Sequence, residues 1–337
     1  MTAAETAQPS AASDQVTVLV LDPIWEVEWS YETERTLLQA AGAHLVVPAN
    51  ADEADRLLPT ADVVIVTGYR RIDAAMIGRL ERAVGILCYS VGMDAVDLEA
   101  AATAGIEVRN VPDYCIDEVS DHALTLLLAA ERRLLPMAAA AGGEWVVHER
   151  ADFKAIRRLR GQTLGIVGAG RIGRAVARKA RAFGFATLAS DPGIRSTDDP
   201  DLPLVELDAL LEASDAIVLC AALTPASRGV IGRDALARVR PGTILVNVAR
   251  GGLVDEAALA EALDDGRVAV AALDVRSPEP PADGDTLARR DTVIVTPHIA
   301  AASREASDDL RRRAGEQVLE ILRARDRVGA TRRGANA

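Results

Sequence analysis

Three residues in the second half of the chain have side chains that together could bind a carboxylate and transfer a proton. Arg250 directly follows the strand-like run VNVA, and a buried guanidinium needs an anion, such as a carboxylate bound through two parallel hydrogen bonds. His298, in TPHIA, has a reference pKa of about 6.5 and can exchange a proton with a hydroxyl or carbonyl oxygen. Glu279, in SPEPP, can orient the imidazole and stabilise its charged form if its loop folds back toward His298.

Each of these residues, taken alone, also has an ordinary structural explanation. His298 alone is typical of a hydrogen-bonded core histidine, Arg250 of an inter-strand ion pair, and Glu279 of a solvated loop acid. Their joint placement favours chemistry, because the carboxyl ends of parallel strands form the ligand-binding edge of an α/β sheet. The polar residues that follow one predicted strand after another are Gly168, Asp191, Ala221 to Thr224, Arg250, Asp274 and His298.

The segment TLGIVGAGRIGRAVARKARAFG predicts a strand, a tight glycine turn and a helix, which is the arrangement that binds dinucleotides. Gly168 permits the turn, Gly170 lets the backbone approach a pyrophosphate, and Gly173 lets the helix pack closely against the strand. The pyrophosphate is then expected at the helix N-terminus, against the amides near Arg171 and Ile172. The alternative is a glycine-rich turn without a ligand.

Asp191 ends the next predicted strand, 18 residues after Gly173, where a carboxylate can accept hydrogen bonds from both hydroxyls of a ribose. An acid at this position repels the 2′-phosphate of NADP. We therefore expect NAD, as NAD+ or NADH, in preference to NADP. The strand, the spacing and the acid together favour a dinucleotide site over an empty turn.

Strand-like and helix-like segments alternate from one end of the chain to the other. The strand-like runs are apolar throughout and rich in β-branched residues, as expected for parallel strands that are covered on both faces. They fall into two series, which predicts an α/β fold with two doubly wound parallel-sheet domains. The first series covers 16–21, 44–49, 62–67, 85–90 and 106–111, and the second covers 163–167, 186–190, 216–220, 243–248, 268–273 and 292–296.

One long helix is predicted between the two series, from about Asp117 to Leu135, and we expect the chain to cross there from one domain to the other. Another helix follows His298 and is expected to return to the first domain, which makes that domain discontinuous. The predicted division is a substrate domain over 15–116 and 300–330, a nucleotide domain over 117–299, and flexible tails over 1–14 and 331–337.

The composition argues against several classes of partner. The 337 residues carry a formal net charge of −12 with a pI near 4.9, which is unfavourable for binding nucleic acid or an anionic membrane. The four histidines and three cysteines show no metal-ligand or disulfide spacing, so we expect no metal and a reducing compartment. No apolar signal region or membrane-length apolar run is present, and we expect a soluble cytoplasmic protein.

The motifs together resemble the D-isomer-specific 2-hydroxyacid dehydrogenase family. The similarity extends from about residue 60 to about residue 320, and the stretch NVPDYCIDEVSDHAL looks closest to the branch with C-terminal-binding-protein-like members. The resemblance implies a flavodoxin-like substrate domain, which is the discontinuous one, and a Rossmann NAD-binding domain. The other matching segments are GIVGAGRIGRAVA, LVNVARGGLVDEAALAEAL, AALDVRSPEPP, VTPHIAAAS, YSVGMDAVDLEAA and RRLRGQTLG.

The resemblance also implies roles for individual residues. Arg250, Glu279 and His298 correspond to the catalytic trio, and the backbone of Val91 and Gly92 helps to hold the substrate carboxylate. Family members close a cleft between the two domains and are usually dimers paired through the nucleotide domain. The implied NAD contacts are Val91, Gly168, Ala169, Gly170, Arg171, Ile172, Gly173, Asp191, Ala221, Ala222, Thr224, Ser227, Val248, Ala249 and Asp274, the last of them to the carboxamide.

Two features of the sequence depart from this pattern or allow two interpretations. The aromatic residue that usually follows LDV is replaced by Arg276, which predicts a more polar wall beside Glu279. Trp25, Trp29 and Tyr31 fall within seven residues. They form either a lid that excludes water from the cleft or a hydrophobic anchor for the helix that follows.

Three functions are compatible with a nucleotide-binding fold of this kind. The expected one is an NAD-dependent oxidoreductase that interconverts a D-2-hydroxy acid and its 2-oxo acid, with His298 as the acid/base. The main alternative is an NAD(H)-sensing regulatory protein of the same fold with little turnover. A third function, an adenosyl-cofactor enzyme such as a methyltransferase, leaves Arg250 and His298 without roles.

Overall fold

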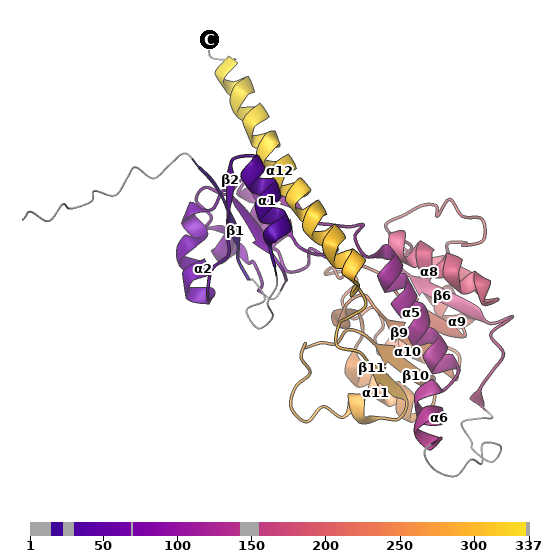
Figure 1. The fold of residues 1–337 in the computed structure, drawn as a ribbon. Helices are drawn as coiled ribbons and strands as arrows, with labels where there is room; N and C mark the ends of the chain where they lie inside the picture. The colour runs from indigo at the N-terminus through magenta and orange to yellow at the C-terminus, as the bar shows by residue number, and fades with distance from the viewer. Residues whose placement is uncertain (1–14, 23–29, 69, 142–154, 335–337) are drawn as a thin grey trace, which may run out of the picture. The chain divides into compact units, whose positions relative to one another are not determined.

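The strands predicted from the sequence form two parallel sheets in the part of the chain that the structure describes (Figure 1). This computed structural model describes residues 15–22, 30–68, 70–141 and 155–334. The chain divides into unit 1, which comprises Met1–Tyr114 and Ser307–Ala337, and unit 2, which comprises Cys115–Ala306. Unit 1 is therefore made of two separate stretches of chain, and its second stretch comes from the C-terminus.

Unit 1 contains a sheet in which every neighbouring pair of strands is parallel. The strands are β1 (Val16–Val20), β2 (Ala43–Val46), β3 (Val63–Val66), β4 (Gly85–Cys88) and β5 (Glu107–Arg109). Their order in the sheet is β2-β1-β3-β4-β5, which is the order of flavodoxin-like folds. The fold class predicted for this part of the chain is confirmed.

Helices cover both faces of this sheet. They are α1 (Glu32–Ala40), α2 (Ala51–Leu57), η1 (Leu58–Thr60), α3 (Ala74–Ile77), α4 (Leu98–Thr103) and α12 (Arg304–Gly334). Val18 and Val20 of β1 belong to a core with Leu38 of α1 and Val318 of α12. Leu19, which lies between them, points to the opposite face and belongs to the core with α2, α3 and α4. The C-terminal helix thus supplies part of the core of unit 1.

Unit 2 contains the second parallel sheet. Its strands are β6 (Thr163–Val167), β7 (Ala186–Ser190), β8 (Ala216–Leu219), β9 (Thr243–Asn247), β10 (Val268–Leu273) and β11 (Val293–Val295). Their order is β11-β10-β9-β8-β6-β7, and a parallel bridge from Leu204 to Ala189 extends the β7 edge. With Leu204 in the place of a third strand, the order follows the Rossmann arrangement 3-2-1-4-5-6, with β11 added at the far edge.

The reversal of strand order at β6 places the crossover helices of unit 2 on opposite faces, because such crossovers are right-handed. The helices are α5 (Ile116–Glu131), α6 (Leu134–Ala140), α8 (Arg171–Ala182), α9 (Leu207–Ala213), α10 (Arg233–Arg238), α11 (Glu256–Asp264) and the short helices η2 (Gly251–Leu253) and η3 (Leu287–Arg289). One core joins α9, α10 and α11 to the sheet. Helices α5 and α8 lie side by side (Figure 1), and Lys179 of α8 donates to Ser120 and Asp121 of α5 at 2.8 and 2.6 Å.

The single helix predicted from about Asp117 to Leu135 is confirmed as far as Glu131 and is wrong at its C-terminal end, where Leu134 begins a second helix. The chain breaks between α5 and α6 at Arg133, whose φ of 51° is left-handed. Pro136 explains the break, because in a continuous helix it could not donate to the carbonyl of Arg132 and its ring would collide with that group. A proline is tolerated in the first turn of a new helix, where it stands here.

Several sequence-based expectations fall on residues outside the described part. Residues 1–14 and the aromatic residues Trp25 and Trp29 belong to this group. Tyr31 is described, and it is 6% exposed within the core of unit 1, which favours the packing role over the lid for this residue. α12 continues to Gly334, so it includes part of the stretch expected as a C-terminal tail. Within the described residues, no helix has the length and apolar character needed to cross a bilayer.

Candidate active site

His298 and Glu279 lie together at the end of unit 2 where the strands finish. The Nδ1 atom of His298 is 2.8 Å from Oε2 of Glu279. The other carboxylate oxygen of Glu279 accepts a hydrogen bond of 2.7 Å from the main-chain amide of Arg276. The loop that carries Glu279 therefore folds back toward His298, as an orienting role requires. With Nδ1 engaged, Nε2 is the ring nitrogen left to exchange a proton with a bound substrate.

The electrostatics of this pair favour the charged form of both partners. The hydrogen bond that His298 donates to Glu279 raises the pKa of His298 above its ordinary value, against the opposing effects of burial and of the positive charge of Arg250. Burial acts to raise the pKa of Glu279, but the hydrogen bonds from His298 and from the Arg276 amide prevail and lower it. Arg250 acts on both groups, so the structure brings the three predicted catalytic residues into one electrostatic environment.

Asp274 fixes the backbone that presents His298. The φ of His298 is 54°, a left-handed conformation that costs free energy for a residue with a side chain. The Asp274 carboxylate accepts the amides of Ile299 and Ala300, both at 2.9 Å, and its carbonyl accepts the amide of His298 at 2.8 Å. These bonds hold the turn in place. The predicted contact of Asp274 with a carboxamide remains a prediction beside this observed role.

Two further side chains meet Asp274 in contacts that the sequence did not predict. The hydroxyl of Thr296 donates to Oδ1 of Asp274 at 2.6 Å. The Nε2 atom of His122, from α5, lies 3.0 Å from that hydroxyl and 3.3 Å from the carboxylate. The polar residues Asp274 and Thr296 both lie at the ends of predicted strands, which was a signal for their contact with each other. His122 is over 150 residues away in the chain, and only folding brings it near.

Arg250 is presented by a tight turn at the end of β9. The side chain of Asn247, which is 1% exposed, closes the turn by accepting the amide of Ala249 at 3.1 Å and donating to the carbonyl of Arg250 at 2.9 Å. A Cβ atom on Gly251 would lie 1.9 Å from the carbonyl oxygen of Arg276. Glycine is therefore required after Arg250, because the main chains before Glu279 and after Arg250 touch there. An asparagine at a strand end is a turn signal that could have identified Asn247.

The three glycines of the predicted dinucleotide loop have three different surroundings. Gly168 has a φ of 97°, and a Cβ there would lie 2.5 Å from the amide nitrogen of Ala221. A Cβ on Gly173 would lie 2.0 Å from the carbonyl oxygen of Gly168, whereas a Cβ on Gly170 would meet nothing within 4 Å. Gly170 is the N-cap of α8 and supplies no side-chain cap. The open side at Gly170 beside a helix N-terminus fits the pyrophosphate of a dinucleotide.

The remaining predicted cofactor residues lie at successive strand ends. Asp191, after β7, is held by the amides of Ala169 and Gly193, each at 2.9 Å from one carboxylate oxygen. After β8, the hydroxyl of Ser227 donates to the carbonyl of Ala222 at 2.7 Å and closes a compact turn. The residues that the structure places together on this edge of unit 2 are Gly168, Ala169, Gly170, Arg171, Ile172, Gly173, Asp191, Ala221, Ala222, Thr224, Ser227, Val248, Ala249 and Asp274.

Val91 and Gly92 belong to unit 1, where they follow β4. The carbonyl of Val91 accepts the Asn110 side chain at 2.6 Å, and the carbonyl of Gly92 accepts the Ser90 hydroxyl at 2.7 Å. The loop is thus held by side-chain bonds from its own unit. Its roles toward NAD and substrate remain predictions.

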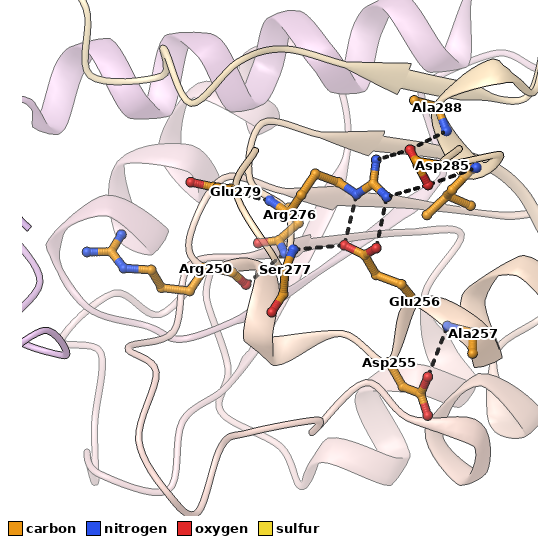
Figure 2. A network of polar contacts seen from close by, with 11 residues as sticks. Arg250, Asp255, Glu256, Ala257, Arg276, Ser277, Glu279, Asp285 and Ala288 are labelled. Atoms are coloured by element: carbon orange, nitrogen blue, oxygen red, sulfur yellow. Dashed lines mark hydrogen bonds and ion pairs between the residues drawn. The ribbon is translucent and has the colours of Figure 1, made fainter. Parts of the chain in front are cut away.

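Arg276 does not form the polar wall that its position in the sequence predicted. Its side chain is 5% exposed and turns toward Glu256 and Asp285, while the side chain of Arg250 points the other way (Figure 2). The prediction failed because the local sequence does not determine the direction of a single side chain in the loop that follows a strand. Among the described residues, no group of three or more His, Cys, Asp or Glu side chains is arranged to hold a metal ion.

Comparisons with known proteins show which family the chain is similar to. A family model described as "D-isomer specific 2-hydroxyacid dehydrogenase, NAD binding domain" matches residues 124–300. A hydroxypyruvate reductase from Thermotoga maritima is 35% identical over 308 residues, which cover 90% of this chain and 96% of that protein. In the solved structures, a D-lactate dehydrogenase from Aquifex aeolicus, complexed with NAD and lactic acid, matches with a TM-score of 0.80 and 25% identity over 91% of this chain and 96% of its own.

A longer relative is also similar. A D-3-phosphoglycerate dehydrogenase from Archaeoglobus fulgidus is 36% identical over 310 residues, which cover 91% of this chain. The same match covers 57% of that protein, so the chain spans little more than half of the length of this relative.

Proposed function

The chain belongs to the D-isomer specific 2-hydroxyacid dehydrogenase family, and on that premise we propose that it is an oxidoreductase that interconverts a D-2-hydroxy acid and the corresponding 2-oxo acid with NAD(H). The observation that carries this proposal is the 2.8 Å contact between His298 and Glu279 in the electrostatic range of Arg250. An acid/base and a cation for a carboxylate are the two groups that such a reaction needs from the protein.

The roles follow from the chemistry of each side chain. Arg250 binds the substrate carboxylate through its planar fork, and the main chain of Val91 and Gly92 is proposed to assist it. His298 gives a proton to the carbonyl oxygen during reduction and takes one from the hydroxyl during oxidation. Glu279 stabilises the imidazolium and keeps the ring oriented. A nicotinamide dinucleotide held by the glycine loop would supply or accept the hydride at the substrate C2.

We propose NAD as the preferred cofactor over NADP. The glycine loop and the N-terminus of α8 would hold the pyrophosphate, and Asp191 would accept the ribose hydroxyls. Both oxygens of Asp191 are already fixed by main-chain amides, so the carboxylate cannot easily turn away from a 2′-phosphate. Its negative charge therefore opposes NADP.

The names of the relatives suggest the size of the acid. Phosphoglycerate, hydroxypyruvate and lactate are all acids with three carbons. We propose a three-carbon 2-hydroxy or 2-oxo acid as the substrate. The test is NADH consumption, followed by absorbance, with a panel from glyoxylate and hydroxypyruvate to phenylpyruvate and 2-oxoglutarate and with NADPH as the cofactor control. Tight NADH binding without turnover on any acid would replace this proposal with the NAD(H)-sensing alternative.

We expect Arg250→Lys to weaken substrate binding more than it slows the chemistry. A lysine keeps the charge but replaces the fork by a single ammonium. Losing one charge-assisted hydrogen bond, worth about 1.5–3 kcal/mol, should raise the KM for the 2-oxo acid roughly 10- to 100-fold. Steady-state kinetics measure this, with Arg238→Lys on an exposed ion pair with Asp208 as the control. An unchanged KM in Arg250→Lys contradicts the assigned role.

The pH dependence should have opposite signs in the two directions. Reduction needs protonated His298, so its kcat/KM is full at low pH and falls as pH rises through the raised pKa of His298. Oxidation needs the neutral ring of His298, so kcat/KM for oxidation rises over the same pH range. Glu279→Gln removes the group that raises this pKa, so both limbs should move to lower pH. Limbs that stay at the same pH in this variant would show that Glu279 does not act on His298.

We also propose a homodimer in the cytoplasm. α6 has the sequence LLPMAAA, and none of its residues is buried against the described part of the chain. Leu134 and Leu135 are 55% and 51% exposed, and an exposed apolar helix of this kind is typical of an interface. The mass in solution, measured by light scattering, tests the dimer. The reducing compartment is supported by three free cysteines.

A further inference from the structure

Arg276 is the centre of a charged cluster that lies behind the active site. Its Nε and Nη2 atoms bind the two oxygens of Glu256, both at 2.8 Å. Its Nη1 and Nη2 atoms bind the two oxygens of Asp285, both at 3.1 Å. The guanidinium therefore spans two carboxylates, one at the start of α11 and one in the loop after Glu279 (Figure 2).

This cluster fixes the main chain that leads to Glu279. Oε1 of Glu256 also accepts the amide of Ser277 at 3.0 Å, and the amide of Arg276 itself binds Oε1 of Glu279 at 2.7 Å. Asp285 in turn accepts the amide of Leu287 at 3.2 Å. The two ends of the loop are thus tied to one guanidinium, and the carboxylate that meets His298 lies between them.

The type of residue at position 276 matters for this arrangement. A guanidinium can bind two carboxylates at once through its planar fork, whereas an ammonium is a single point charge. A buried ion cluster stabilises a fold little compared with apolar residues of the same size, because desolvation opposes the attraction. What this cluster supplies is geometry. The pKa of Arg276 is raised, chiefly by the hydrogen bond to Glu256, so the group stays charged.

We propose that Arg276 is a positioning residue whose clamp on Glu256 and Asp285 holds Glu279 in contact with His298. The inference rests on the proposed function, since it explains how the acid/base pair is kept in register. Arg276 touches neither substrate nor cofactor in this proposal. It acts through the amides of its own residue and of Ser277.

The test compares Arg276→Met with Arg233→Met. Arg233 makes a two-bonded ion pair with Glu261, which lies on the same helix α11 as Glu256. The control thus removes a similar pair without touching the Glu279 loop. The charged groups acting on His298 are Glu279, Arg250 and Asp274, and all of them remain in both variants.

The first readout is the pKa of the His298 imidazole, measured by NMR without cofactor or substrate and assigned with a His298→Asn variant. In Arg276→Met we expect this pKa to fall toward about 6.5, and in Arg233→Met we expect no change. The second readout is kcat for reduction, expected to fall about 10- to 100-fold, less than the 10²–10⁴ of removing a whole acid/base. A His298 pKa and a kcat that both stay at the wild-type values in a folded Arg276→Met would overturn the proposal.

If Arg276→Met does not fold, a second variant tests the same proposal. Glu256→Gln keeps an acceptor for Ser277 and leaves Arg276 bound to Asp285, so it should fold and shift the His298 pKa in the same direction by a smaller amount. No shift in Glu256→Gln would then count against the proposal. Failure of the proposed function is a separate result, namely a wild-type protein without turnover on any acid. In that case the His298 pKa values of the wild type and of Arg276→Met can still be compared, so the positioning role is tested without activity.

Discussion

His298→Asn should lower kcat about 10²–10⁴-fold in both directions, which is the usual scale for a positioned acid/base. Asparagine is chosen because it tolerates the left-handed backbone that His298 adopts at a φ of 54°. The turn held by Asp274 should therefore survive, and the loss should reflect the missing proton transfer. Steady-state rates with the best acid measure it, and NADH binding by fluorescence should stay near the wild-type value.

His44→Asn is the matched control for this prediction. His44 is an exposed histidine on β2 of unit 1, and the same substitution there should leave kcat unchanged. A His298→Asn variant with kcat within a few-fold of the wild type would remove His298 from the mechanism. A large loss in both variants would point to a general effect of the substitution on the protein.

Gly251→Ala should reduce both stability and activity. The added Cβ would lie 1.9 Å from the carbonyl oxygen and 2.0 Å from the carbonyl carbon of Arg276, and backbone atoms can move only together with the neighbouring main chain. Overpacking of this kind costs about 1–3 kcal/mol of unfolding free energy, and more where the backbone must move. Because Arg250 precedes this contact and Glu279 follows it, a displacement near 1 Å should also lower kcat/KM by about 10²-fold.

Gly252→Ala is the control, since it adds the same methyl group one residue later. A Cβ there would meet the ends of two side chains, Leu223 at 3.1 Å and Arg228 at 3.2 Å, and these can shift at little cost. Denaturant unfolding and kinetics of both variants should separate them clearly. Equal stability and equal activity in the two variants would mean that the contact at Gly251 does not hold the active site together.

The two predictions concern the same physical feature. Arg250, Glu279 and His298 come from three different loops, and each is held by main-chain contacts rather than by the others alone. Asn247 fixes the turn that carries Arg250, and Asp274 fixes the turn that carries His298. The contact at Gly251 joins the first of these turns to the loop of Glu279. Small changes in these supports should therefore act on kcat/KM as strongly as changes in charge.

Much of the fold could be predicted from the sequence. The strand positions followed from short β-branched runs separated by helix-length segments, because the length and apolar character of such runs are properties of the local sequence. The glycine loop followed from its spacing, from the strand before it and from the acid at the end of the next strand, since each glycine meets a local steric requirement. The discontinuous first unit was expected because one helix remained after the last strand of the second series.

Other features were decided by contacts between residues distant in the chain. The break at Arg133 was missed because no glycine or proline stands at the break itself, while Pro136 acts on the carbonyl of a residue four positions earlier. The position of His122 beside Asp274 depends on how α5 packs on the sheet of unit 2.

The loop after β10 shows this division most clearly. The sequence by itself determined that an arginine, a glutamate and a histidine follow strand ends in a dinucleotide-binding fold. Only the tertiary structure decided that Arg276 turns toward Glu256 and Asp285 and that Glu279 turns toward His298. The physical reason is that a loop has no repeating pattern of its own, so the direction of its side chains is set by the partners that folding brings within hydrogen-bonding distance.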